Sequence, residues 1–161
     1  MLQFDNPLVI RLSLTQNDTG QRAFAIFIIH RIYQEMFARG VQQRITHAVV
    51  FDEAHRAARL KLSAQMAKEC RKYGLAMLAA SQEIKDFDES LIQSIATYLV
   101  LRVGEGDAKL LARYMAPVDT AKIIADKLKT LPRYEGYFFT EGYKTGRRVH
   151  LQNPFAAVDG V

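Results

Sequence analysis

The sequence lacks the features that mark several specialised classes of protein. It has one cysteine, Cys70, so no disulfide can form within the chain, which fits a reducing compartment such as the cytoplasm. No apolar run reaches membrane length and no signal peptide opens the chain, so we expect no membrane partner. The four histidines show no metal-ligand spacing with cysteine or carboxylate residues, and no G-x-S-x-G motif occurs.

The composition is that of an ordinary soluble domain. Hydrophobic residues make up 49% and charged residues 24% of 161 residues, enough for one domain with a real core. The formal net charge of +5 permits an anionic partner such as nucleic acid. The basic residues are scattered along the sequence, however, so a merely basic surface explains the charge equally well.

A long helix is predicted near the amino end. It begins at Asp18 or Thr19 and ends at Arg39, with Gly40 just past its end. A short β-rich run, PLVIRLSLT at 7–15, precedes it and predicts a strand. The helix is apolar nearly all round, so it must be buried on more than one side or lie in a subunit interface.

Three further apolar runs predict buried strands. They are THAVVFD (46–52), LAMLAAS (75–81) and YLVLRV (98–103), and none alternates, as is typical of parallel strands covered on both faces. The first two are joined by a helix over about 54–73, which Gly74 ends. One apolar stripe runs along this helix, formed by Ala58, Leu62, Met66, Cys70 and Tyr73.

The remaining sequence predicts helices and a closing hairpin. A short helix is expected near 88–96, and two helices, 107–115 and 119–131, are separated by Pro117. EGYFFTE and RRVHLQN then form a C-terminal β-hairpin. The order of elements predicts an α/β fold with a mostly parallel sheet, as one domain over 1–161.

Two adjacent carboxylates, Asp52 and Glu53, follow the first buried strand. Ligands of open α/β sheets gather at the carboxyl ends of the strands. The pair therefore suggests a Walker B element, in which Asp52 holds the water shell of Mg²⁺ and Glu53 polarises the attacking water. Acidic residues that cap the following helix are an equally good explanation of the pair alone.

Two other positions are candidates through their place in the predicted sheet. Gln82 follows the second strand, so it should arrive beside Asp52 and Glu53 and sense the terminal phosphate; otherwise it is a polar loop residue. Arg71 lies about 27 Å along the helix from its start, at about 1.5 Å per residue, too far to reach its own chain's site. It could serve a neighbouring subunit as an arginine finger, although a solvated basic helix end is favoured without further support.

Together these segments resemble a known family. The chain looks like the second half of a HerA-type ATPase domain of the HerA/FtsK superfamily, through VVFDEAH, ECRKYGL, LAASQ and TYLVLR, in order and at roughly the family's spacing. The resemblance covers about residues 7–105 and, more weakly, the closing hairpin YEGYFFTEGYKTGRRVHLQNP. Within the one domain we expect a Walker B and sensor core over 1–105, followed by helices and the closing hairpin over 106–155.

The resemblance implies a partial RecA-like, three-layer P-loop NTPase fold. It implies a ring of six subunits that hydrolyses ATP with Mg²⁺ and moves double-stranded DNA, in some members together with a nuclease in DNA-end resection. By position Asp52 is the Mg²⁺-site acid, Glu53 the catalytic glutamate, Gln82 the sensor and Arg71 the finger. Lys72 is a second basic contact, and Arg102 matches a family position without an assigned role.

One essential part of such a domain does not occur in the sequence. There is no G-x-x-x-x-G-K-[ST] loop to seat the phosphates, and EGYKTG at 141–146 lacks its spacing. We therefore expect a truncated piece, part of a split gene or a remnant that does not hydrolyse ATP without an N-terminal P-loop segment. The apolar edge of 75–81 should then be covered by another segment or copy.

Two other functions remain open. Asp52, Glu53, Ala54 and His55 spell the DEAH helicase box, but the coupling Ser-Ala-Thr is replaced by AASQ at 79–82. A non-catalytic assembly or regulatory module derived from such an ATPase is the other alternative. A P-loop encoded upstream of Met1, in frame or in an adjacent reading frame, would favour the ATPase.

Overall fold

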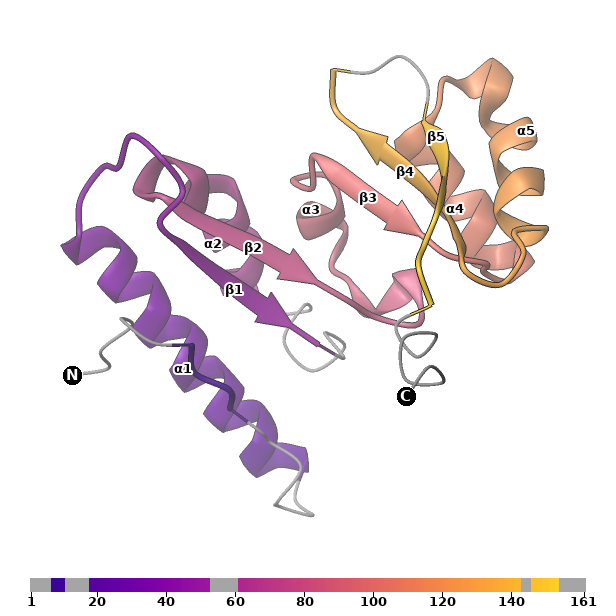
Figure 1. Ribbon diagram of the computed structural model, residues 1–161. Coiled ribbons are helices and arrows are strands. Elements are labelled where there is room, and N and C mark those ends of the chain that lie inside the picture. The colour runs from indigo at the N-terminus through magenta and orange to yellow at the C-terminus, as the bar shows by residue number, and fades with distance from the viewer. Residues whose placement is uncertain (1–6, 11–17, 53–60, 143–145, 154–161) are drawn as a thin grey trace, which may run out of the picture. The chain divides into compact units, whose positions relative to one another are not determined.

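The computed structural model of the protein describes residues 7–10, 18–52, 61–142 and 146–153 (Figure 1). The chain divides into two compact units, Met1–Ala80 and Ser81–Val161. The single domain expected from the sequence stays a prediction. Within the described ranges, every helix is too short or too polar to cross a membrane.

The first unit has a two-stranded parallel sheet. β1 (His47–Phe51) and β2 (Leu75–Ala79) pair in register from His47↔Leu75 to Phe51↔Ala79. The predicted parallel pair is thus confirmed. α2 (Lys61–Glu69) and the 3₁₀ turn η2 (Cys70–Tyr73) connect the two strands, since parallel neighbours need a crossover.

The core of this unit lies between helices and one face of the sheet. α1 (Asp18–Ala38) ends as predicted before Gly40, which has a φ of 73°. The predicted stripe of the second helix is confirmed where it is described, because Met66 and Cys70 are buried. They form a cluster with Ile29, Met36 and Leu75, against which Val49, Phe51 and Met77 pack.

The other face of β1 and β2 is open in this unit. Burial alternates along β1, and Val50 and its partner Leu78 are 66% and 51% exposed. Cover on both faces, which the sequence predicted, is therefore not observed within this unit. Side chains alternate across a strand, and the core that α1 and α2 form lies against the face of Val49 and Met77.

The amino-terminal strand prediction is also not met where it can be examined. Residues 7–10 have no regular secondary structure, and Leu8 and Val9 are 55% and 80% exposed. A strand needs a neighbour to bind its backbone groups, and none of the described strands pairs with these residues. Residues 11–15 of the predicted strand lie outside the described residues.

The second unit contains a three-stranded antiparallel sheet in the order β3-β4-β5. β4 (Glu135–Thr140) and β5 (Arg147–His150) form the predicted closing hairpin. β3 (Thr97–Val100) was expected as a third parallel strand, but its hydrogen-bonded neighbour is β4, which runs antiparallel to it. α4 and α5 lie between β3 and β4 in the sequence, so these two strands pair only after a long connection.

Helices cover one face of this second sheet. α4 (Glu105–Met115) and α5 (Val118–Lys129) match the two helices predicted around Pro117. η3 (Ile84–Asp86) and α3 (Glu89–Ile92) precede β3, and the Asp88 carboxylate caps α3 by accepting the Ser90 N–H at 2.9 Å. The core combines the helices with Val100 and Tyr137 of the sheet.

Gly74 ends η2 in a conformation that suits only glycine. Its φ is 70°, and a Cβ there would lie 2.6 Å from Gln42 Cβ and 2.7 Å from the Arg44 carbonyl oxygen. We expect Gly74→Ala to lower the free energy of unfolding by about 1–3 kcal/mol, measured by urea denaturation. Gly106→Ala, in α4 with open space around the site, should instead raise it by about 0.5–1 kcal/mol. Equal stabilities of both variants would contradict the tight turn.

Tyr98 should give the second unit a dependence on alkaline pH. Its hydroxyl donates to the Ile92 carbonyl oxygen at 2.6 Å, and burial raises the pKa of Tyr98 to about 12. The phenol of an unfolded chain ionises near pH 10. The buried neutral phenol therefore contributes its full stabilisation below pH 10, and that contribution to the free energy of unfolding is lost as the pH rises toward 12. Absorbance titration should show a late-ionising tyrosine that Tyr98→Phe removes and Tyr134→Phe retains.

Candidate functional site

The candidate site lies at the carboxyl edge of the first unit's sheet. The Ala80 N–H donates to the Phe51 carbonyl oxygen at 2.9 Å, one step beyond the last ladder pair, so the two strands end together. Asp52 follows in a turn and is exposed. The meeting of the two strand ends, which the sequence predicted, is confirmed. Glu53 lies outside the described residues.

Gln82 lies three residues beyond the end of β2. It is exposed and belongs to the second unit, so its approach to Asp52 stays a prediction. Its neighbour Ser81 donates from Oγ to the Asp86 carboxylate at 2.5 Å. This bond ties the segment before Gln82 to η3, and the Gln82 side chain is not part of it.

Arg71 and Lys72 lie at the opposite edge of the same sheet. Both are exposed in η2, directly before Gly74 and the start of β2. The five paired residues of β1 separate the two edges by about 16 Å, at about 3.3 Å per residue. Arg71 is therefore far from Asp52 of its own chain. Arg102, just past β3, is exposed as well.

Two arginines near Arg71 were missed from the sequence. Arg39 and Arg44 lie in the segment after α1, and the Gln42 N–H of that segment donates to the Lys72 carbonyl oxygen at 3.1 Å. The Thr46 N–H donates to the Gly74 carbonyl oxygen at 2.8 Å. No motif marks these arginines. The signal that could have found them is the excess of basic residues in the first 80 positions.

The donor chemistry at the carboxyl edge fits a magnesium ion held through water. Carboxylate oxygens are the ligands Mg²⁺ prefers, and it usually keeps several waters and takes only one or two carboxylates. Asp52, the acid predicted to hold the ion through water, lies in the described ranges. Those ranges contain no group of three or more histidine, cysteine or acidic residues that could form an all-protein metal cage.

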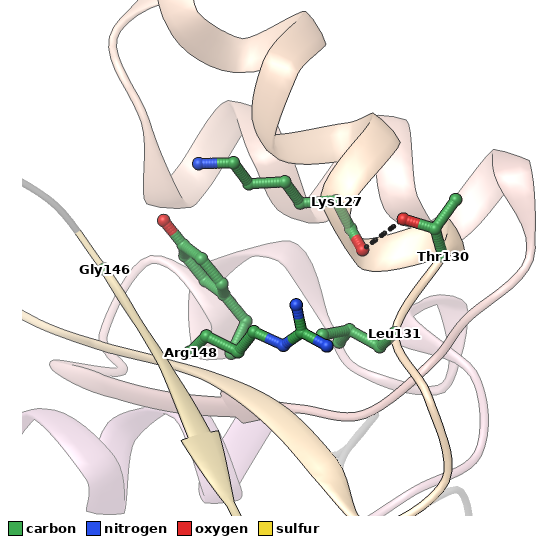
Figure 2. A pocket seen from close by; sticks show the side chains of 6 residues that line it. Lys127, Thr130, Leu131, Gly146 and Arg148 are labelled. Atoms are coloured by element: carbon green, nitrogen blue, oxygen red, sulfur yellow. Dashed lines mark hydrogen bonds between the residues drawn. The ribbon is translucent and has the colours of Figure 1, made fainter.

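A pocket of about 230 Å³ lies in the second unit, between α5 and the hairpin (Figure 2). Its lining includes Lys127, Tyr137 and Arg148, and the Thr130 hydroxyl donates to the Lys127 carbonyl oxygen at 3.3 Å. Arg148 is paired with the Glu135 carboxylate. The volume is below the roughly 300–1,000 Å³ of typical small-molecule sites, so this pocket is the weaker candidate.

The fold of the described chain is that of part of a P-loop NTPase domain. The bacterial conjugative coupling protein TrwBdeltaN70, in an unbound form, superposes with a TM-score of 0.67 at 13% identity, over 84% of this chain and 38% of TrwB. Plasmid coupling protein TrwB in complex with the GTP analogue GDPNP gives 0.66 at 16% identity, over 84% of this chain and 38% of that protein.

A second group of similar structures comes from a virus. The genome packaging NTPase B204 from Sulfolobus turreted icosahedral virus 2, in complex with AMPPCP, gives a TM-score of 0.63 at 14% identity, over 82% of this chain and 62% of B204. The chain thus spans less than two thirds of each of these proteins. The likeness agrees with the HerA/FtsK-type resemblance noted from the sequence. Comparisons with protein-family models and with curated proteins give no match.

The exposure of Arg71 and Lys72 predicts that neither is needed for folding. We expect Arg71→Ala and Lys72→Ala to change the free energy of unfolding by less than about 0.5 kcal/mol, as at exposed surface positions. Met66→Ala, one turn earlier and fully buried, should cost about 2–5 kcal/mol. Urea denaturation of the three variants tests this. A loss at Arg71 as large as that at Met66 would mean that Arg71 is structural.

Proposed function

We propose that this chain is the part of an ATP-driven DNA translocase that carries the residues for hydrolysis. The observation that carries the proposal is the parallel register of β1 and β2, which places Asp52 where two neighbouring strands end. The similarity of fold supports it, because B204 is a genome packaging NTPase and TrwB is a conjugative coupling protein.

The carboxyl edge of the first sheet is the proposed hydrolytic centre. Asp52 holds the water shell of Mg²⁺, and Glu53 orients the attacking water and accepts its proton. The resemblance to HerA-type enzymes makes Gln82 the proposed sensor of the terminal phosphate. When bound, Mg²⁺ and ATP supply the charge neutralisation and the leaving group. The P-loop that seats the phosphates comes from another segment, since the 161 residues contain none.

The opposite edge is the proposed contact with the next subunit. Arg71 is too far from its own Asp52, so it acts as a finger on the nucleotide of a neighbouring copy, with Lys72 beside it. Such an arrangement requires a head-to-tail contact between copies, and the resemblance to HerA-type enzymes favours its closure into a ring of six subunits around double-stranded DNA. A nuclease partner, in DNA-end repair, fits the same resemblance.

A second candidate function is a non-catalytic assembly or regulatory module. The absence of a P-loop motif from all 161 residues favours it, because such a chain could keep the fold and the subunit contacts without hydrolysis. The two candidates differ in one property. Only the first becomes an ATPase when a P-loop segment is supplied.

The purified chain alone should show no ATP turnover with Mg²⁺ above a protein-free blank. Completed by a P-loop segment, it should hydrolyse ATP, and Glu53→Gln should lower kcat by about 10²–10⁴-fold because a positioned general base is lost. A phosphate-release assay measures both rates. Glu89→Gln, at an exposed acid of α3, is the matched control and should keep the rate.

Two results would contradict the proposal. Turnover by the isolated chain that Glu53→Gln abolishes would show that no further segment is needed. A completed enzyme that keeps its full rate with Glu53→Gln would remove Glu53 from the centre, and no turnover after completion would favour the assembly module.

A further inference from the structure

The net positive charge of the protein comes from one of its two units. Residues 1–80 contain eleven lysines and arginines against six acids, whereas residues 81–161 contain eleven of each. The whole net charge of +5 therefore belongs to the first unit. An asymmetry of this kind indicates that this unit, and not the chain as a whole, faces an anionic partner.

Four of these cations gather around one turn at the amino edge of β1 and β2. They are Arg39, Arg44, Arg71 and Lys72, which we call the turn cluster. Besides the two backbone bonds already described, the Thr46 hydroxyl donates to the Gly74 carbonyl oxygen at 3.2 Å. The close approach of Gly74 to the Arg44 carbonyl fixes the two segments against each other.

The turn cluster is not neutralised within the described residues. Glu35 is paired with Arg31 at 3.2 Å. Glu69 accepts a hydrogen bond from the Tyr33 hydroxyl at 3.4 Å and, among the described residues, forms no ion pair with the turn cluster. Arg39 donates to the Thr46 hydroxyl, which leaves its charge uncompensated. Arg44, Arg71 and Lys72 are exposed. Like charges held close together repel, and an anion with several charges would relieve that repulsion.

We infer that Arg39 and Arg44 complete, together with Arg71 and Lys72, a binding surface for the linked phosphate groups of a nucleotide. This rests on the proposed function, in which Arg71 and Lys72 reach the nucleotide of a neighbouring copy. The inference adds Arg39 and Arg44 as phosphate contacts. A triphosphate concentrates its charges in a small volume, which suits four cations on two segments joined at one turn, whereas duplex DNA is bound along an extended row of phosphates.

Calorimetric titration of the isolated chain with inorganic tripolyphosphate at low ionic strength tests the surface without hydrolysis. The double variant Arg39→Gln/Arg44→Gln should bind tripolyphosphate at least about tenfold more weakly. Added salt should also weaken the binding of tripolyphosphate to the unsubstituted chain. The Arg44 side chain is exposed and has no partner among the described residues. Arg44→Gln alone should therefore weaken tripolyphosphate binding about three- to fivefold and leave the free energy of unfolding unchanged.

The matched control removes the same charge from the second unit. Arg102→Gln/Arg113→Gln, at two exposed arginines, should change the affinity less than twofold. Equal losses in the two double variants would reduce the effect to net charge and overturn the inference. So would a labelled DNA duplex that binds through Arg39 and Arg44 and is not displaced by tripolyphosphate.

The inference and the proposed function fail separately. If tripolyphosphate does not bind while hydrolysis by the completed enzyme still depends on Glu53, the proposed role of the turn cluster is wrong and the hydrolytic centre stands. If tripolyphosphate binding depends on Arg39 and Arg44 while Glu53→Gln leaves the rate of the completed enzyme unchanged, the binding surface stands and the proposed hydrolytic centre is wrong.

Discussion

The parallel hydrogen-bonded ladder between β1 and β2 is the constraint on which the rest of the first unit depends. Its register, from His47↔Leu75 to Phe51↔Ala79, fixes which residues meet at each end of the sheet. Because parallel strands end at the same edge, Asp52 emerges beside the end of β2 and not at a random loop position. A slip of either strand by one residue would turn its own core residue, Val49 in β1 or Met77 in β2, away from the core, so burial holds the register in place.

The same ladder gives the two edges of this sheet opposite chemical character. An acid follows the strands at the carboxyl edge, and the turn cluster surrounds their amino edge. The length of the strands keeps these groups about 16 Å apart, at about 3.3 Å per residue. A chain built in this way cannot bring its own Arg71 to its own Asp52. The proposed division of labour between neighbouring copies is consistent with that distance.

Each unit covers only one face of its sheet, and the open faces are apolar. In the first unit Val50 and Leu78 are exposed, and in the second the cross-strand partners Leu99 and Phe138 are 52% and 37% exposed. Only the sheet of the first unit is parallel, and parallel sheets are almost always covered on both faces, whereas an antiparallel sheet can leave one face to water.

Most local elements could be read from the sequence, and most partnerships between them could not. The bounds of α1, the stripe through Met66 and Cys70, the break at Pro117 and the closing hairpin follow from periodicity and from turn residues, which are local properties. The sequence also placed Asp52 at a strand end. Only the tertiary structure decided that β3 pairs with β4, that one face of each sheet stays open and that Arg39 and Arg44 join Arg71 around Gly74. Strand partners, exposed faces and charge clusters arise from contacts between residues far apart in the chain, and no local pattern encodes them.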